Sequence, residues 1–437
     1  MIFVSFMDHS MTPSSNNPAT VVVPSRMKGL GCHPSDRPLR VALLLSCSSF
    51  EGFFKRVQGQ TRASYLANYR NDWSWYYASG MLDNGVEPLI YVPSLQERGR
   101  YETDAGVPVR YLPLAAWYWP IENVWLKRLC RTNRFSLYAD EWLNSVAFFA
   151  ALETSLHEDR VDILYVQEYW SGRFDHLARR LQMPVVGADH GGLSTRVLKF
   201  LKRSAMQQAA LCYCQTADEC AIVGKFGGSA TWAPNGCDTS QFTPGSPAQR
   251  GRSILTVARL TNKQKRTSDL VRALARLPEE WTLDIVGSGP DRPMLERLIS
   301  RLRLKRRVTF HGFVERGAIA EFYRRCGVYA MPSSNEAVAL SALEAMACGA
   351  AVVLSRIRAF SELVTDGVDG RLVDVGDVSG LAEAILDAWE RRADFGPSAH
   401  KAVSTRYDSQ RLYARLTSSL REVAGRTTSG AHVHQSA

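Results

Sequence analysis

Two glutamates, Glu336 and Glu344, are the residues of this sequence that most suggest contact with a bound ligand. Both lie in the stretch 331–354, which is otherwise small, apolar or weakly polar. A carboxylate accepts hydrogen bonds from the hydroxyl groups of a ligand. Structural roles are equally compatible with the spacing, because Ser341-x-x-Glu344 fits a helix capping box and Glu336 could be an ordinary loop charge. The residues alone leave both interpretations open.

The elements around these glutamates can be predicted from the local pattern. Residues 327–331 are apolar and predict a short buried strand, which Pro332 and Ser333 end. Residues 340–348 are rich in Ala, Leu and Met and predict a helix closed by Gly349. Residues 350–354 are apolar and β-branched, which predicts a second buried strand. The segment is therefore a strand–loop–helix–strand unit of a parallel sheet, with one glutamate in the loop and one in the helix.

The same segment resembles a known motif. Pro-Ser-x-x-Glu, seven residues and then Glu-Ala-Met-Ala-x-Gly is similar to the donor-site motif of GT-B glycosyltransferases, most closely glycosyltransferase family 4 (glycosyl transferases group 1). The resemblance implies that Glu336 faces the donor sugar and that Glu344 holds the nucleotide ribose. It also implies that backbone amides at the helix N-terminus, where partial positive charge favours anions, meet the diphosphate. Those amides belong to Ala337, Val338, Ala339 and Leu340.

Further donor-binding residues follow from the resemblance to the family. Arg259, at the end of a predicted strand that starts at Ser253, and Lys265 match the basic pair that clamps the donor diphosphate, with Lys263 as a competitor for Lys265. Gly287 and Gly289 match a Val-Gly-x-Gly-Pro turn of the family. The sequence contains no Asp-x-Asp, so cations and amides are expected to stabilise the leaving diphosphate without a metal.

The N-terminal half carries weaker signals. Residues 39–46 predict a buried strand. The polar loop 46–59 after it, which contains Gly52, is a candidate acceptor wall or donor-phosphate wall, because ligands gather at the carboxyl ends of parallel strands. Glu168 follows another predicted strand, 161–167, and is a candidate acceptor contact. Residues 184–192 resemble the family's Pro-Val-x-x-x-x-His-Gly element, which implies that His190 lies near the donor sugar and is catalytic.

Composition limits the partners. The formal net charge of +10 suggests an anionic partner such as a sugar nucleotide, acidic lipid or nucleic acid. Nucleic acid is the least expected, because the five cations of residues 301–307 are not interleaved with stacking aromatics. The nine cysteines lack paired spacing, and Cys212-x-Cys214 with Cys220 is interpreted as small buried residues and not as a metal site. No apolar run reaches the ~18–20 residues of a membrane-spanning helix.

Residues 115–135 place aromatic side chains next to cations. They predict either a core-facing helix with a solvated basic edge or an interfacial segment at a membrane. The peripheral membrane contact would be made by Trp117, Trp119, Trp125, Lys127 and Arg128.

The expected architecture is α/β, with two Rossmann-like parallel-sheet domains facing across a cleft. We expect an N-terminal extension without fixed structure at 1–38, an acceptor domain at 39–243, a nucleotide-sugar domain at 250–408, a closing helix at 409–423 and a disordered tail at 424–437. The expected location is cytoplasmic, with peripheral contact at the inner membrane face.

The resemblance implies transfer of a sugar, with retention and without a metal or other cofactor, from a nucleotide diphosphate sugar to a hydroxyl of a saccharide, lipid-linked or small-molecule acceptor. The alternative is a degenerate protein that binds nucleotide without turnover. It arises because Ala337, Val338 and Ala339 stand where the family usually has Gly-Phe-Gly.

Overall fold

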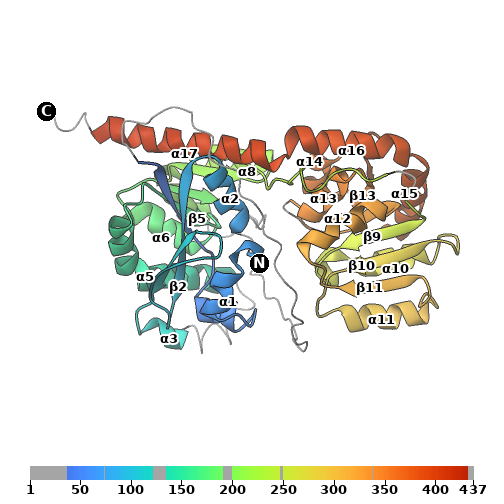
Figure 1. Ribbon diagram of the computed structural model, residues 1–437, viewed down its shortest axis with the longest axis horizontal. Coiled ribbons are helices and arrows are strands. Elements are labelled where there is room, and N and C mark those ends of the chain that lie inside the picture. Colours follow the sequence, from blue (N-terminus) through green and yellow to red (C-terminus); the bar gives the residue numbers. More distant parts are fainter. Residues whose placement is uncertain are drawn as a thin grey trace.

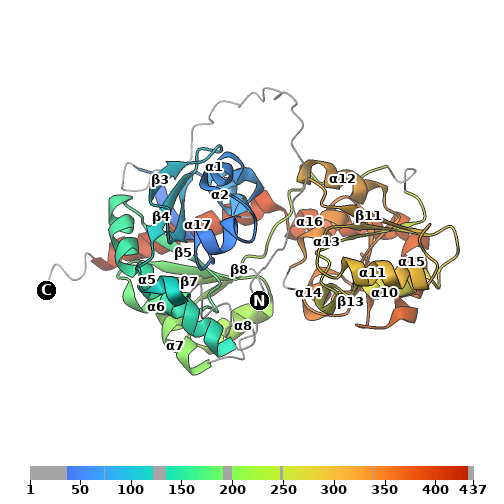
Figure 2. The same ribbon diagram turned by 90° about the horizontal axis from the view of Figure 1, so that it is seen from below.

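The computed structural model describes residues 37–72, 74–121, 134–189, 199–246, 250–336 and 338–431. Two sheets, each with helices on both faces, form two α/β domains that lie side by side (Figures 1 and 2). The residues expected to form the N-terminal extension fall almost entirely outside the described ranges. So does His190.

The N-terminal sheet has eight strands in the order β3-β4-β2-β1-β5-β6-β7-β8, all parallel except for the antiparallel edge strand β3. Its strands are β1 (Leu39–Leu44), β2 (Val86–Ser94), β3 (Gly99–Glu102), β4 (Pro108–Pro113), β5 (Ile163–Gln167), β6 (Val185–Ala188), β7 (Leu211–Cys214) and β8 (Ala230–Trp232). The helical elements are η1 (Glu51–Lys55), α1 (Arg62–Ala67), η2 (Tyr69–Asn71), α2 (Trp75–Asp83), α3 (Tyr118–Pro120), α5 (Arg134–Glu158), α6 (Gly172–Arg180), α7 (Lys199–Gln208) and α8 (Ala217–Lys225).

The C-terminal sheet has six strands in the order β11-β10-β9-β12-β13-β14, and every neighbouring pair is parallel. Its strands are β9 (Ser253–Val257), β10 (Thr282–Val286), β11 (Val308–Gly312), β12 (Val328–Met331), β13 (Ala351–Ser355) and β14 (Arg371–Val373). The helices are α9 (Asn262–Lys265), α10 (Thr267–Leu274), α11 (Arg292–Arg301), α12 (Arg316–Arg325), α13 (Leu340–Ala347), α14 (Arg358–Leu363), α15 (Val378–Glu390), α16 (Arg392–Arg406) and α17 (Ser409–Ala431).

Most of the strands form because their sequences are largely apolar, as parallel strands covered on both faces require; the edge strand β3 is the polar exception. Alternate side chains therefore enter different cores. Val41 and Leu43 of β1 pack in one N-terminal cluster, whereas Ala42 and Leu44 pack in the other, on the opposite face of the sheet. The second sheet is covered in the same way on both faces. The carboxyl ends of all parallel strands in a domain meet at one edge, which is where the polar loops discussed below are found.

The closing helix α17 returns from the C-terminal domain and lies along the N-terminal domain (Figure 1). Leu416, Leu420 and Val423 join the N-terminal core. Gly80 of α2 permits this contact, because a Cβ there would lie 2.2 Å from the ring of Tyr413.

The helix continues to Ala431, so the expected end at residue 423 and the expected disordered tail from 424 are wrong over these residues. Val423 is buried against the N-terminal core and Ala424 packs there as well, which supports helix beyond the expected end.

Candidate active site

The segment that carries both glutamates folds as predicted. Strand β12 ends at Met331, α13 runs from Leu340 to Ala347, and Gly349 follows with φ of +68°, as a helix-ending glycine should. Strand β13 then pairs in parallel with β12. Glu336 lies in the loop at the carboxyl end of β12, and Glu344 lies on α13.

Glu336 forms an ion pair with Lys265. The Lys265 Nζ lies 2.6 Å from Glu336 Oε1, and the two side chains are only 16% and 8% exposed, respectively. Lys265 is therefore the lysine that contacts Glu336, whereas Lys263 is exposed; the assignment of the diphosphate clamp to Lys265 stays a prediction. Two residues far apart in sequence, each proposed for donor binding from its own motif, are therefore in direct contact.

The backbone holds this ion pair in place. The Ser334 amide donates to the Gln264 carbonyl at 2.8 Å, and the Gln264 side-chain amide donates to the Asn335 carbonyl at 3.0 Å. The loop carrying Glu336 is thus bonded to α9, which carries Lys265. Such fixed geometry preorganises charged groups for a ligand, because little reorganisation remains to be made upon binding.

Gly287 and Gly289 pack closely against the backbone on either side of Arg259. A Cβ at Gly287, where φ is +121°, would lie 2.1 Å from the Ala258 carbonyl oxygen, and a Cβ at Gly289 would lie 2.5 Å from that of Leu260. The Leu260 amide also donates to the Ser288 carbonyl. Only glycine permits this close backbone approach. The two glycines therefore position the half-buried Arg259 at the carboxyl end of β9.

Glu344 does not form a capping box. The N-cap of α13 is Ala339, and this N-terminus has no side-chain cap hydrogen bond. Ser341 lies inside the helix, where its Oγ accepts a hydrogen bond from Tyr329 at 2.9 Å, and Glu344 Oε2 accepts one from Tyr323 at 2.9 Å. The capping-box interpretation is wrong because the helix starts two residues too early for Ser341 to cap it. The absence of a side-chain cap suits an N-terminus that meets an anionic ligand.

Val338 and Ala339 line a small pocket together with Gln215 and Thr216 of the N-terminal domain. The residues just before α13 thus face the other domain. Ala339 has φ of −81°, a conformation that alanine adopts without strain. Ala337 lies outside the described residues.

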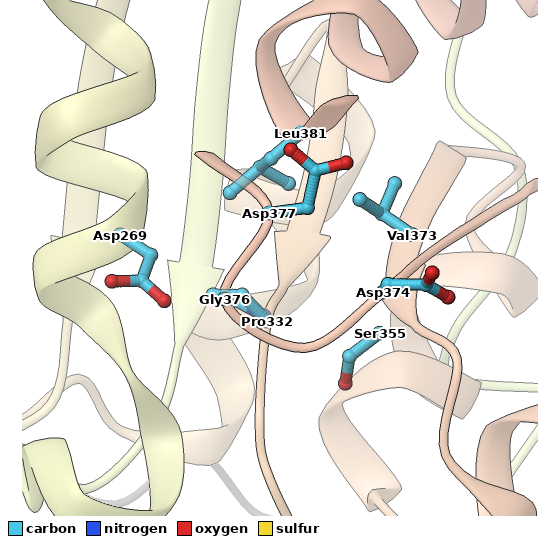
Figure 3. Close-up of a pocket in the computed structure, with 8 residues that line it drawn as sticks. All are labelled: Asp269, Pro332, Ser355, Val373, Asp374, Gly376, Asp377 and Leu381. Atoms are coloured by element: carbon cyan, nitrogen blue, oxygen red, sulfur yellow. The ribbon is translucent and has the colours of Figure 1, made fainter. Parts of the chain in front are cut away.

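A second pocket lies beside the loop that leaves β12 (Figure 3). It is lined by Pro332 and by three carboxylates, Asp269, Asp374 and Asp377. Each has a structural partner: Asp269 pairs with Arg266 at 2.7 Å, Asp374 with Arg356 at 3.3 Å, and Asp377 caps α15. The residues that line this pocket therefore offer carboxylates and no unpaired cation, whereas the cation Lys265 lies at Glu336, further along the loop that leaves β12. Within the described ranges no group of three or more His, Cys, Asp or Glu is arranged to hold a metal ion.

On the N-terminal side, Glu168 follows β5 with φ of +62°, an unusual conformation for a side-chain-bearing residue. Its amide donates to the Ala188 carbonyl at 2.7 Å, and its carboxyl bonds to that of Asp189. Burial, and then the Asp189 charge, raise the pKa of Glu168 well above its usual range. The same causes raise the pKa of nearby Glu219 to about 7. Glu168 is therefore placed next to the residue that precedes His190.

The loop after β1 differs from the expectation. Gly52 is buried in η1, where its amide donates to Ser49 Oγ at 2.8 Å, and it does not lie in an open polar loop. Sequence reasoning missed Arg173 of α6, which is 4% exposed and donates to the carbonyls of Leu45 and Cys47, both at 2.7 Å. A lone arginine on a helix carries no sequence signal for this role.

Of the residues assigned to membrane contact, Trp117 and Trp119 are 46% and 56% exposed. The predicted core-facing helix would bury Trp117. Trp117 is exposed instead, and its neighbour Tyr118 is the residue that is buried. Trp125, Lys127 and Arg128 lie outside the described residues. Among the described helices, none is both long and apolar enough to span a bilayer.

Comparison with known proteins concerns the family of the C-terminal domain. Residues 241–403 match the family described as Glycosyl transferases group 1. A D-inositol 3-phosphate glycosyltransferase of Xylanimonas cellulosilytica is 37% identical over 197 residues, which are 41% of this chain and 46% of that protein. A phosphatidyl-myo-inositol mannosyltransferase of Mycolicibacterium smegmatis is 34% identical over 46% of this chain and 53% of that protein. The chain thus spans about half the length of these curated relatives.

Solved structures match over nearly the whole chain. A sucrose-phosphate synthase of Thermosynechococcus elongatus has a TM-score of 0.69 at 18% identity, covering 89% of this chain and all of that one (100%). HepE of Anabaena, solved in complex with UDP, has a TM-score of 0.64 at 19% identity, covering 88% of this chain and 100% of that one. At these identities the likeness establishes the fold. The C-terminal domain of this chain thus matches the glycosyl transferases group 1 family over residues 241–403, and its two domains have the GT-B fold.

Proposed function

We propose that the protein transfers a sugar from a nucleotide diphosphate sugar to an acceptor hydroxyl, as a member of glycosyltransferase family 4, with retention at the anomeric carbon and without a metal. The observation that carries the proposal is the Lys265–Glu336 ion pair beside the N-terminus of α13, which has no side-chain cap. A cation, a carboxylate and backbone amides are the groups that a diphosphate and an adjacent sugar need.

The chemistry follows from where charge develops. As the bond between the anomeric carbon and the diphosphate oxygen breaks, the diphosphate leaves with the bonding electrons and gains negative charge. Lys265, Arg259 and the amides before α13 stabilise that charge. Glu336 accepts hydrogen bonds from donor-sugar hydroxyls, and Glu344 accepts them from the ribose. The acceptor oxygen bonds to the anomeric carbon, and its hydroxyl proton passes to an oxygen of the departing diphosphate.

The acceptor is proposed to bind on the N-terminal side, near Glu168 and His190. The curated relatives act, by name, on inositol phosphate or on phosphatidyl-inositol. A polyol or a lipid-linked acceptor is therefore the first class to test, with saccharides second. UDP is the first nucleotide to test, since the HepE structures hold UDP or UDP-glucose. We place the enzyme in the cytoplasm, where nucleotide sugars are made, with peripheral contact at the membrane.

Nucleotide release tests the proposal. The purified full chain is incubated with UDP-, GDP-, ADP- and TDP-sugars, with and without inositol phosphates or phosphatidylinositol, and free nucleoside diphosphate is measured. Release from one donor that rises when an acceptor is added supports the proposal. Nucleotide binding without release from any donor supports the rival proposal of a degenerate protein. Against that rival, Ala339 keeps a negative φ and so needs no glycine.

A further inference from the structure

Five cations gather at the end of α11 and in the turn after it. They are Arg297, Arg301, Arg303, Lys305 and Arg306, here called the α11 patch, and all five are exposed. In the part of the chain that the structure describes, none of the five pairs with a carboxylate; the acid on α11, Glu296, bonds to Arg292 at 2.9 Å instead. The patch therefore carries five positive charges without local compensation.

The patch is held rigidly. The next residue, Arg307, is turned inward, and its guanidinium donates to the Trp281 carbonyl at 2.8 Å and to the Leu274 and Pro278 carbonyls at 3.0 and 2.8 Å. Leu304 is buried in the C-terminal core between the exposed cations. Neither the hydrogen bonds of Arg307 nor the burial of Leu304 involves a residue assigned to the donor site. Donor binding therefore does not explain the cations at this surface.

The patch lies on the same side of the molecule as the exposed tryptophans. Figure 1 shows α11 at the lower edge of the C-terminal domain and α3 at the lower edge of the N-terminal domain. Figure 2, seen from below, shows α11 at the front of its domain. Trp117 and Trp119 are exposed at α3. Helices α3 and α11 therefore lie along the same edge of the molecule in Figure 1, with the exposed tryptophans at the first and the exposed cations at the end of the second.

These two features favour a lipid bilayer over nucleic acid. Tryptophan is the side chain that prefers the boundary between headgroups and acyl chains, and cations near an anionic leaflet gain about 1 kcal/mol each. Single-stranded nucleic acid would require aromatic side chains among the cations on which bases could stack. The exposed residues of the α11 patch are all cations, and the exposed tryptophans lie on the other domain.

We propose that the face formed by α3 and the α11 patch binds the surface of an anionic lipid bilayer, with the cations on anionic headgroups and Trp117 and Trp119 at the headgroup level. The inference rests on the peripheral membrane contact of the proposed function, to which it assigns a surface, and it does not depend on the donor chemistry. It would hold both domains against the membrane and would bring the enzyme to a lipid-linked acceptor.

The test is co-sedimentation of the full chain with vesicles of phosphatidylcholine alone or of phosphatidylcholine with phosphatidylglycerol. The variant R301E/K305E/R306E reverses three charges of the patch. Each cation contributes about 1 kcal/mol to binding at an anionic surface, and a loss of about 1.4 kcal/mol lowers affinity about tenfold. Reversing three cations is therefore expected to lower the affinity for anionic vesicles by at least about a hundredfold. The matched control, K401E/R411E/R415E, reverses three exposed cations on α16 and α17, at the upper edge of Figure 1, and should bind within about twofold of wild type.

W117A/W119A separates the two parts of the surface. It should weaken binding several-fold while leaving the salt dependence of binding unchanged, whereas the triple reversal should flatten that dependence. Circular dichroism and nucleotide binding check that every variant is folded. The proposal is overturned if wild type does not prefer anionic vesicles, if R301E/K305E/R306E binds as wild type does, or if the control loses as much. Displacement of the vesicles by equimolar RNA would assign the patch to nucleic acid instead.

Discussion

Replacing Lys265 by methionine removes the cation of the Lys265–Glu336 pair but keeps most of the side-chain volume. Glu336, 8% exposed, then holds a charge with little access to water. Orphaning a buried charge costs about 3–5 kcal/mol, and a charge-assisted hydrogen bond is worth about 1.5–3 kcal/mol. Because Lys265 is itself 16% exposed and water can enter, we expect K265M to lose about 2–3 kcal/mol of unfolding free energy.

The second variant, E336Q, should cost less, about 1 kcal/mol, because glutamine still offers an oxygen to the ammonium group. In the double variant K265M/E336Q no charge is orphaned. It should therefore be more stable than K265M, with a coupling energy of about 1–2 kcal/mol in the cycle. Urea unfolding followed by tryptophan fluorescence measures all four proteins.

Turnover should respond differently. If both residues contact the donor, E336Q restores stability to K265M without restoring activity, and the double variant stays at least about a hundredfold below wild type. Additive stability losses would show that the two side chains are not coupled. Recovery of turnover together with stability would show that the pair only supports the loop, and the assignment of both residues to the donor site would be wrong.

Four further predictions follow from the same geometry. Arg259→Ala should lower kcat by about a hundredfold or more and exposed Lys263→Ala by less than about threefold; equal effects in a donor-turnover assay would exclude Arg259 from the clamp. Glu344→Gln should weaken nucleotide binding with little change in Tm, while Tyr323→Phe should leave binding largely intact; calorimetry that finds normal binding in Glu344→Gln contradicts the ribose role. EDTA should leave most activity, and a complete loss that Mn²⁺ reverses would refute the metal-free scheme. Burial raises the pKa of Glu219 to about 7 from 4.5, so the folded state holds this proton more tightly and stability falls as pH rises between these values; Glu219→Gln should remove up to about 3 kcal/mol of that fall in unfolding titrations.

The sequence predicted the strands and the helix around Glu336 and Glu344 well because the signals for them are local. The apolar runs and Gly349 were sufficient to predict both strands and the helix around the two glutamates. What local pattern could not decide was which lysine faces Glu336. Lys263 and Lys265 stand two residues apart in one short helix, and their directions depend on how α9 packs against the loop at Ser334.

The sequence-based predictions were wrong where the outcome depends on the exact position of one residue. Ser341 and Glu344 have capping-box spacing, but the helix begins at Leu340, and a shift of this size is within the uncertainty of any boundary taken from sequence. Arg173 could not have been found, because its role depends on carbonyls more than a hundred residues away (|i−j| of 126 and 128) that only the folded sheet brings near.

Calorimetry of nucleoside diphosphate binding tests the central claim most directly, namely that the region of Lys265, Arg259 and the α13 N-terminus holds the donor diphosphate. UDP is titrated against uridine, with GDP, ADP and TDP and their nucleosides as alternatives. We predict that one diphosphate binds far more tightly than its nucleoside, and that Lys265→Ala removes this difference while Lys263→Ala preserves it. A diphosphate that binds no better than its nucleoside, or a Lys265→Ala variant that binds it as wild type does, would contradict the account.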